Sequence, residues 1–341
     1  MKPIKKPFSE PSNALPSFST WVLAFCALTI VTVLSSSGCL PGSPTDPNAI
    51  QSWGRRGLGD GRFQKPRAVT IDANQQLYVV DMTGRIQVFD TTGTLLRQWR
   101  TPAVKNGKPC GLSMSNDQKL IVSDTHYHRV LFYELDGTLI ESRTIGGQHG
   151  RGPEEFGFVT DTVQDSEGNY YVAEYGDYDR IQKFNSTGEY LYEWGGHGSK
   201  VGEFLRPQGL AIDANDHLWV ADASNHRIQV FDATGESPKI MHVFGEPGKA
   251  SGQLNYPYDL FFDGKGHVFV CEFGNHRIQK FTLAGSPLGT WGKPGRKLGE
   301  LHQPWGMCQD AKGMIHVLDS YNHRVQQFYW NDKMSTDGSW N

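Results

Sequence analysis

The sequence predicts an all-β protein in which six similar units close into a ring. One arginine recurs at steps of 44, 51, 47, 50 and 47 residues, at Arg85, Arg129, Arg180, Arg227, Arg277 and Arg324. Repeats of this length are typical of propeller blades. Around each arginine, four short apolar runs are separated by turn residues, and no segment after residue 50 has the apolar period of a helix. We therefore expect a six-bladed β-propeller with four antiparallel strands in each blade.

The first 39 residues are expected to be a signal sequence or a membrane anchor. Residues 1–20 carry Lys2, Lys5 and Lys6 against a single acid, and residues 21–40 carry no charge. The apolar run at 21–34 is short for a membrane-spanning helix and normal for a signal peptide. The run that ends at Cys39 resembles a bacterial lipoprotein signal, in which the cysteine is the lipid attachment site, although Ser36 stands where leucine is usual. Lipidation, an uncleaved anchor and ordinary secretion stay open, and all three predict an exported protein of the cell envelope.

Residues 40–48 contain three prolines and are expected to be a semi-rigid linker. After residue 39 the chain carries 30 basic and 35 acidic residues. This balance argues against nucleic acid as the main partner, because neutralising phosphates requires an excess of cations. A local basic cluster at Arg55, Arg56, Arg62, Lys65 and Arg67 is the exception.

Each repeated arginine follows an acid by four to six positions, and these acids are Asp81, Asp124, Glu174, Asp222, Glu272 and Asp319. We expect the acid to end the second strand and the arginine to begin the third, so that charge-assisted hydrogen bonds fix the turn between them. Four of these turns contain a histidine, at His128, His226, His276 and His323, and the other two have Gly84 and Asp179 in its place. A motif present six times around a ring does not converge on one reacting atom, so we interpret it as structural.

The sixth unit lacks a fourth strand, because the polar tail at 331–341 follows its third. The segment "AIQSWG" at 49–54 matches the fourth-strand endings "LYEWG" at 191–195 and "LGTWG" at 288–292. We therefore expect the propeller to span residues 49–330, with an N-terminal strand completing the last blade and removing two unpaired edges.

The string "NHRIQVF", preceded by "LWVAD" and "RPQGLAID", resembles the NHL repeat, and the likeness extends over all six units. The resemblance implies a six-bladed propeller but no single activity. Proteins of this kind include RNA-binding and protein-binding modules, extracellular sensor domains, and the zinc-dependent peptidyl-hydroxyglycine lyase. The lyase resemblance implies metal-binding histidines at the start of the inner strand. The matching residues are Arg67, Cys110, Thr160, Gln208, Tyr258 and Trp305, with no histidine among them.

These six positions differ in every blade and are expected near one mouth of the central channel. Arg67 offers hydrogen-bond donors, Tyr258 and Trp305 offer rigid aromatic surfaces, and Gln208 completes the predicted ligand-binding set. The next position holds an acid in two blades, Asp161 and Asp259, and a small residue in the other four. These acids either share a cation or cationic ligand across the channel, or accept hydrogen bonds from nearby backbone N–H groups.

We expect a membrane-tethered binding or scaffold module for a protein, peptide or glycan, working without a cofactor. The alternative is a metal-dependent lyase or lactonase-type enzyme, with zinc or calcium held by Asp161, Asp259 and backbone groups. Motifs for a serine hydrolase or a CxxC redox site are absent from the sequence. The identity of the ligand, the face that binds it and the oligomeric state stay open.

Overall fold

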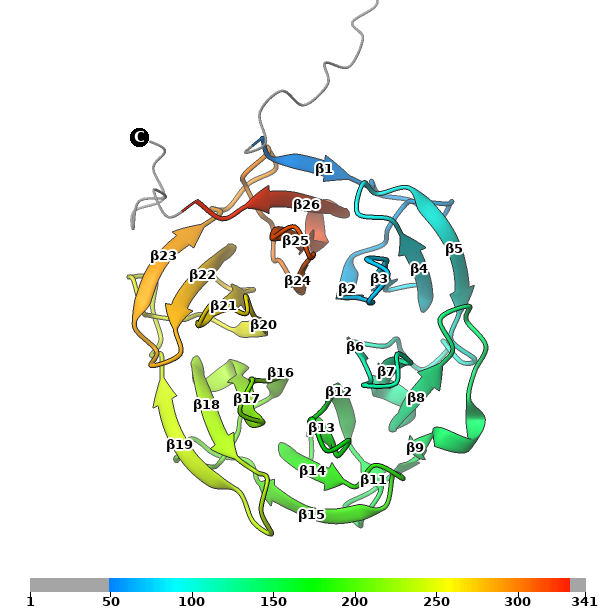
Figure 1. Cartoon of the computed structure of the whole chain (residues 1–341), viewed down its shortest axis with the longest axis vertical. Coiled ribbons are helices and arrows are strands. Elements are labelled where there is room, and N and C mark those ends of the chain that lie inside the picture. The colour runs from blue at the N-terminus through cyan, green and yellow to red at the C-terminus, as the bar shows by residue number, and fades with distance from the viewer. Residues whose placement is uncertain (1–48, 332–341) are drawn as a thin grey trace, which may run out of the picture. The chain divides into compact units, whose positions relative to one another are not determined.

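The computed structural model describes residues 49–331, which form six four-stranded antiparallel sheets around a central channel (Figure 1). The predicted fold class is therefore confirmed. The expected signal or anchor with Cys39, the linker and the tail after Asn331 lie outside the described residues. Within residues 49–331, no helix has the length and apolar character needed to cross a membrane.

In five blades the four strands follow one another along the chain, from the channel outward. Blade 1 contains β2 (Pro66–Ile71), β3 (Leu77–Asp81), β4 (Arg85–Phe89) and β5 (Leu95–Arg100). Blade 2 contains β6 (Gly111–Met114), β7 (Leu120–Asp124), β8 (Arg129–Tyr133) and β9 (Ile145–Gly146). Blade 3 contains β12 (Phe158–Gln164), β13 (Tyr170–Tyr175), β14 (Arg180–Phe184) and β15 (Tyr190–Gly195). Blade 4 contains β16 (Pro207–Ile212), β17 (His217–Asp222), β18 (Arg227–Asp232) and β19 (Lys239–Phe244). Blade 5 contains β20 (Pro257–Phe262), β21 (His267–Glu272), β22 (Arg277–Thr282) and β23 (Pro287–Trp291).

Blade 6 is built from both ends of the described chain. It contains β24 (Met307–Gln309), β25 (Met314–Asp319) and β26 (Arg324–Tyr329), with β1 (Gln51–Trp53) as its outermost strand (Figure 1). β1 runs antiparallel to β26 and pairs Trp53 with Val325. The predicted closure of the ring by an N-terminal strand is confirmed.

The short elements lie in the connections between strands. Three 3-10 turns, η1 (Thr125–Tyr127), η3 (Ala223–Asn225) and η4 (Ser320–Asn322), follow the acid of their blade and end at a histidine in the left-handed region. A fourth, η2 (Glu141–Arg143), interrupts the path to the short β9. β10 (Gln148–His149) and β11 (Glu155–Phe156) form a small parallel pair between blades 2 and 3.

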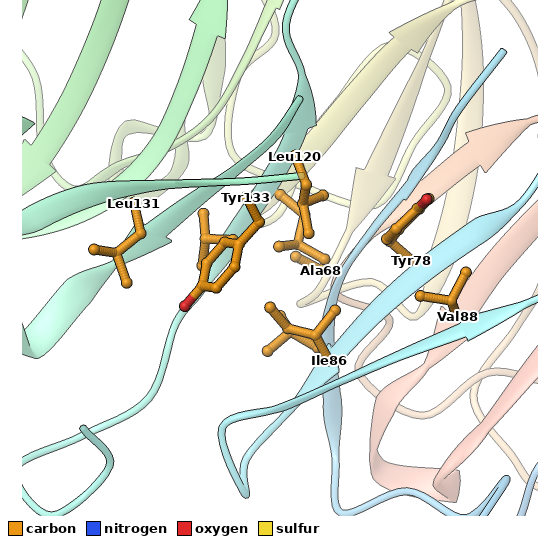
Figure 2. Packing of buried hydrophobic residues seen from close by; sticks show 10 residues of the cluster. Ala68, Tyr78, Ile86, Val88, Leu120, Leu131 and Tyr133 are labelled. Atoms are coloured by element: carbon orange, nitrogen blue, oxygen red, sulfur yellow. The ribbon is translucent and has the colours of Figure 1, made fainter. Parts of the chain in front are cut away.

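The hydrophobic core lies between the blades. Six clusters of buried residues each join the facing surfaces of two neighbouring sheets. Figure 2 shows the one between blades 1 and 2, where Tyr78 and Ile86 meet Leu120, Leu131 and Tyr133. Because both faces of each sheet are covered in this way, the middle strands β3 and β4 are buried along their whole length.

The acid and arginine of each repeat form an ion pair in all six blades. In blade 4 the distance from Arg227 Nε to Asp222 Oδ2 is 2.7 Å. The same guanidinium donates to the carbonyls of Ser199, Lys200 and Glu203 in the loop that leads into the blade. The pair therefore fastens the inter-blade loop as well as the turn, which agrees with the structural interpretation.

The repeated histidines link one blade to the next. Nδ1 of His226 accepts the backbone N–H of Tyr256, that of His276 accepts Gln303 N–H, and that of His323 accepts Lys65 N–H. In blade 3, Asp179 plays this part through the N–H of Arg206. An imidazole accepts through Nδ1 only when that nitrogen carries no proton, so these links require neutral rings.

Candidate functional site

The predicted site residues do gather at one mouth of the channel. All six line a small cavity there, to which every blade contributes at least one residue: Arg67, Gln208, Tyr258, Trp305, Asp161 and Asp259. The cavity has room of about 30 Å³, enough for about two water molecules. Thr160, the corresponding residue of blade 3, does not belong to its lining, because its hydroxyl donates to the carbonyls of Ala173 and Pro207.

Arg67 carries a half-buried charge without an anion. Its Nη1 donates to Cys110 Sγ at 3.3 Å, and its guanidinium lies 5.0 Å from the centroid of the Trp305 ring. Its Nε is buried and has no hydrogen-bond partner, and the same holds for Trp305 Nε1. No Asp or Glu among the described residues is within salt-bridge distance of Arg67.

Four aromatic rings from blades 5 and 6 form a continuous wall beside Arg67. Tyr258 stacks on Phe273 with 4.4 Å between ring centroids, and Trp305 meets both rings edge-on. Tyr321 meets Phe273 edge-on, and Lys65 lies over the Tyr321 ring at 4.0 Å. Phe273 and Tyr321 were not predicted. Their signal was available, because both lie in the repeated turn after the acid at positions where the other blades carry different residues.

A second cation, Arg206, contacts the Tyr258 end of the aromatic wall. The Arg206 guanidinium lies 4.7 Å from the centroid of Tyr175 and 5.8 Å from that of Tyr258, and its Nε donates to Gln208 Oε1. Gln208 is only 3% exposed and Tyr258 only 6%. These two predicted residues therefore shape the cavity, whereas Trp305 and Arg67 are the more accessible members.

Asp161 and Asp259 accept backbone hydrogen bonds in matching geometry. Asp161 accepts the N–H of Thr162 in its own strand and that of Leu210 in the next blade, both at 2.9 Å. Asp259 accepts the N–H of Leu260 at 2.8 Å and that of Met307 in the next blade at 2.7 Å. This is the second of the two arrangements that the sequence left open.

Burial raises the pKa of both carboxyl groups. The pKa of Asp161 is raised to about 8, first by loss of hydration and then by the charge of Asp259. Loss of hydration raises the pKa of Asp259 to about 7. The channel therefore holds protons on its carboxyl groups close to neutral pH.

The residues present do not fit a resident zinc or calcium ion at this pair. Each carboxylate oxygen already accepts an N–H group, and a cation prefers oxygens whose lone pairs face it. Across residues 49–331, no three His, Cys, Asp or Glu side chains are grouped so that they could hold a metal ion.

Glycines alternate with residues that carry a side chain around the channel. Blades 2, 4 and 6 carry Gly111, Gly209 and Gly306, and blades 1, 3 and 5 carry Ala68, Asp161 and Asp259. Each glycine lies against the α-carbon of the corresponding residue in the next blade. Gly111 faces Asp161, Gly209 faces Asp259 and Gly306 faces Ala68. A Cβ on Gly111 would meet Thr160 O at 2.5 Å, and one on Gly209 would meet Tyr258 O at 2.6 Å. The glycines thus permit a narrow channel with pseudo-threefold order.

The two faces of the ring differ in charge. Because the strands are antiparallel, the inter-blade loops and the turns between second and third strands share the mouth face, and the other turns share the opposite face. The mouth-face connections contain 13 Lys and Arg against 8 Asp and Glu, counted over 54–65, 82–84, 101–110, 125–128, 147–157, 176–179, 196–206, 223–226, 245–256, 273–276, 292–306 and 320–323. The opposite-face turns contain 4 basic and 14 acidic residues, counted over 72–76, 90–94, 115–119, 134–144, 165–169, 185–189, 213–216, 233–238, 263–266, 283–286 and 310–313.

Comparison with known families gives a match to the NHL repeat at residues 204–231, 254–281 and 301–328. These segments cover the entry loop and first three strands of blades 4, 5 and 6. The chain is a six-bladed propeller with NHL repeats in blades 4, 5 and 6. Mouse NHL repeat-containing protein 3 is 29% identical to it over 185 residues, which is 49% of this chain and 52% of that protein. The propeller is also 33% identical to rat peptidylglycine alpha-amidating monooxygenase over 135 residues, 36% of this chain and 13% of the rat protein.

The chain thus spans about half the length of the mouse relative and a small part of the rat one. Among solved structures, virginiamycin B lyase from Staphylococcus aureus superposes with a TM-score of 0.56 at 13% identity, covering 84% of this chain and 97% of the lyase. A streptogramin B lyase gives a TM-score of 0.58 at 12% identity, covering 83% and 98%. At such identities, the likeness of the NHL-repeat propeller to these lyases concerns the fold alone.

Proposed function

We propose that this NHL-repeat propeller is a membrane-tethered binding module of the cell envelope, which holds a peptide segment of a partner protein at its mouth face. The observation that carries the proposal is the unshared set at the channel mouth. Arg67 and Trp305 each have a buried hydrogen-bond donor without a partner. They adjoin an aromatic wall whose residues are not part of the repeated motif. Aromatic rings and arginine are the side chains most enriched among energetically dominant contacts at protein interfaces.

Rigid presentation is the mechanism that the ring supports. Ion pairs in every blade and the closing strand β1 fix the loops that carry the site before any ligand arrives. A preorganised site loses less conformational entropy on binding. The excess of cations on the mouth face favours a partner segment of negative charge, because complementary charge speeds association and excludes wrong partners.

The path of the chain also supports exposure of this face. β1 begins and β26 ends at the opposite, acidic face, since Gln51 pairs with Gln327 there and Trp53 with Val325 nearer the mouth face. Both ends of the described chain therefore leave on the side away from the site.

Site-specific photo-crosslinking tests this proposal. A photoreactive phenylalanine analogue would replace Tyr256, which is 40% exposed on the mouth face, or Leu283, which is 36% exposed on the opposite face. We expect one protein adduct from position 256 in the intact envelope, lost when Trp305→Ala is added, and no such adduct from position 283. Adducts from 283 alone, or a protein found only in the cytoplasm, would contradict it.

A catalytic role is the second candidate, and the raised pKa of Asp161 beside a cavity is the observation that favours it. In that case the enzyme would be of the lyase or lactonase type. Metal analysis of the purified protein separates the two. Because Asp161 and Asp259 already accept backbone N–H groups, we expect no resident ion at this pair. Stoichiometric zinc or calcium that survives dialysis and is lost in Asp161→Ala or Asp259→Ala would overturn this expectation and favour the enzyme.

A further inference from the structure

The pseudo-threefold order of the channel is incomplete at blade 1. In blades 3 and 5 an aspartate reaches across to the next blade and accepts the N–H of the residue after its glycine, Leu210 or Met307. The corresponding residue of blade 1 is Ala68, and the corresponding N–H in blade 2 belongs to Leu112. The methyl group of Ala68 therefore takes the position that the carboxylates of Asp161 and Asp259 have in blades 3 and 5.

The strand register places the Leu112 N–H in the same orientation as the other two. Leu112 pairs with Val122, as Leu210 pairs with Val220 and Met307 with Val317. In an antiparallel ladder, residues at equivalent pairs turn their N–H groups to the same side. Leu112 N–H thus points toward the channel, like the two N–H groups that the aspartates occupy.

Blades 1 and 2 contribute most to the lining of the cavity. Blades 1 and 2 each line it with three consecutive residues, down to Val69 and Leu112, whereas the other blades contribute one or two each. Its room of about 30 Å³ corresponds to about two water-sized groups, which matches the two oxygens of a carboxylate. A tetrahedral phosphate is larger than a planar carboxylate, so we expect this cavity to favour the carboxylate.

The positively charged Arg67 adjoins the Ala68 position and lines the same cavity. Arg67 precedes Ala68 in β2, and its guanidinium has no carboxylate partner among the described residues, with Nε buried and unbonded. A half-buried guanidinium without an anion is costly, and a planar carboxylate matches its fork of donors.

We propose that the space bounded by Arg67, Ala68, Gly111 and Leu112, the Ala68 subsite, receives a carboxylate of the bound peptide, from an Asp or Glu side chain or from a C-terminus. One oxygen accepts the Leu112 N–H and the other pairs with the Arg67 guanidinium. The ligand thereby supplies the third carboxylate of the ring. This inference rests on the proposed function and names the group that the site recognises.

The neighbouring carboxyl groups permit an anion here near neutral pH. Because burial raises the pKa of Asp161 to about 8, its carboxyl group is largely protonated at pH 7 and repels the incoming carboxylate little. The carboxyl group of Asp259, whose pKa burial raises to about 7, gains charge in the same range. Repulsion therefore grows, and binding weakens, as the pH rises through 7 to 8.

Amide NMR of the full chain, labelled with ¹⁵N-leucine, tests the subsite with sodium acetate as the probe. The Leu112 resonance is assigned with Leu112→Ile. We expect a saturable shift of this resonance with acetate, and none with acetamide or with sodium phosphate at equal ionic strength. Arg67→Gln should weaken acetate binding by about tenfold or more, since charge-assisted bonds contribute most of it.

Ala68→Asp provides the sharper test, because the new side chain places a carboxylate in the subsite. Its Leu112 resonance should be shifted without ligand and should not respond to acetate. The neutral isostere Ala68→Asn, whose amide oxygen can also accept the Leu112 N–H, should shift the resonance less because it carries no charge. Absence of a saturable shift in the wild type, or an equal acetate response in Ala68→Asp and wild type, would overturn the proposal. Should Ala68→Asp not fold, Arg67→Gln decides alone. Crosslinking from position 256 without an acetate response would refute the subsite and leave the proposed function standing.

Discussion

Trp53 lies directly opposite Val325 in the β1–β26 pair, although 272 residues separate them along the chain. The Trp53 ring also contacts Phe63 and Phe89 of blade 1, with centroids 5.8 and 4.6 Å away. This single side chain therefore joins the last blade to the first. We expect Trp53→Ala to lower the free energy of unfolding by about 3 kcal/mol, measured by urea denaturation.

Trp194→Ala is the matched control, because Trp194 lies at the end of an outermost strand whose blade is formed by consecutive chain. Both variants lose packing, but only Trp53→Ala should raise amide exchange in blades 1 and 6 together. Equal exchange patterns in the two variants would contradict closure through Trp53.

The channel glycines differ in how much space surrounds them, which gives a second prediction. Gly111→Ala and Gly209→Ala would place a Cβ within 2.6 Å of a carbonyl oxygen, whereas the nearest atoms to a Cβ at Gly306 are 3.4 Å away. We expect the first two to lose about 2 kcal/mol and Gly306→Ala less than about 1 kcal/mol. Thermal unfolding of the three variants measures the order, and a Gly306→Ala loss as large as the others would refute it.

Removing the acid of one repeat should be far more damaging than removing a surface acid. Asp222 is fully buried and accepts hydrogen bonds from Leu205 N–H, Asn225 and Arg227. Asp222→Ala leaves these donors and a charge without a partner, so we expect a loss of about 3 to 5 kcal/mol in urea. Glu134→Ala, which breaks the exposed pair with Lys119, should cost less than about 1 kcal/mol. Similar losses for both would be inconsistent with this account.

Acid should loosen the contacts between blades. The pKa values of His226, His276 and His323 are lowered, mainly by burial. Each of these rings also accepts a backbone N–H through Nδ1. The unfolded chain therefore binds more protons below about pH 6.5, so stability falls as the pH decreases from there. The triple His→Asn variant keeps a residue that tolerates the left-handed conformation and should lose this part of the pH dependence. Urea midpoints between pH 7 and 5 measure it, and identical slopes for both proteins would refute the role of the histidines.

Alkali should act through the channel carboxyl groups. The pKa of Asp161 is raised to about 8 and that of Asp259 to about 7, so the folded state holds protons that the unfolded chain has released. Stability should therefore decline as the pH rises through 7 to 8. We expect the melting temperature to fall between pH 6.5 and 9 in the wild type, and to fall less in Asp161→Asn/Asp259→Asn. A flat wild-type profile would contradict the raised values.

The fold was predictable because its determinants are local and repeated. The period of the arginines, the four-strand order of blade 4 and the unmatched Trp53 segment each have a direct physical meaning in the sequence. The structural role of the acid and arginine followed from their sixfold recurrence. The role of the histidines was not predictable from the sequence. The N–H groups that donate to them lie in the next blade, and that of Tyr256 is about 30 residues away from His226 along the chain.

Which residues line the channel mouth was predictable, but their geometry was not, and their role in binding stays a prediction. Position in the repeat selected Arg67, Trp305, Tyr258 and Gln208, and the structure brings them together. The burial of Gln208 and the stacking of Phe273 on Tyr258 depend on how neighbouring turns meet above the channel. The sequence contains no periodic signal for such contacts. The missing carboxylate at Ala68 became visible only when the hydrogen bonds of Asp161 and Asp259 were compared.

Closure by β1 and β26 also sets the order of events during synthesis. β1, the first strand among residues 49–331, has no partner until residues 324–329, at the far end of the propeller, have been translated. Until then the nascent chain exposes two unsatisfied strand edges, which invite pairing with other chains. A stop codon before residue 324, or a deletion of β26, would therefore leave a fragment with unpaired strand edges. We expect such a fragment to aggregate or exchange strands with other copies instead of forming a smaller closed ring.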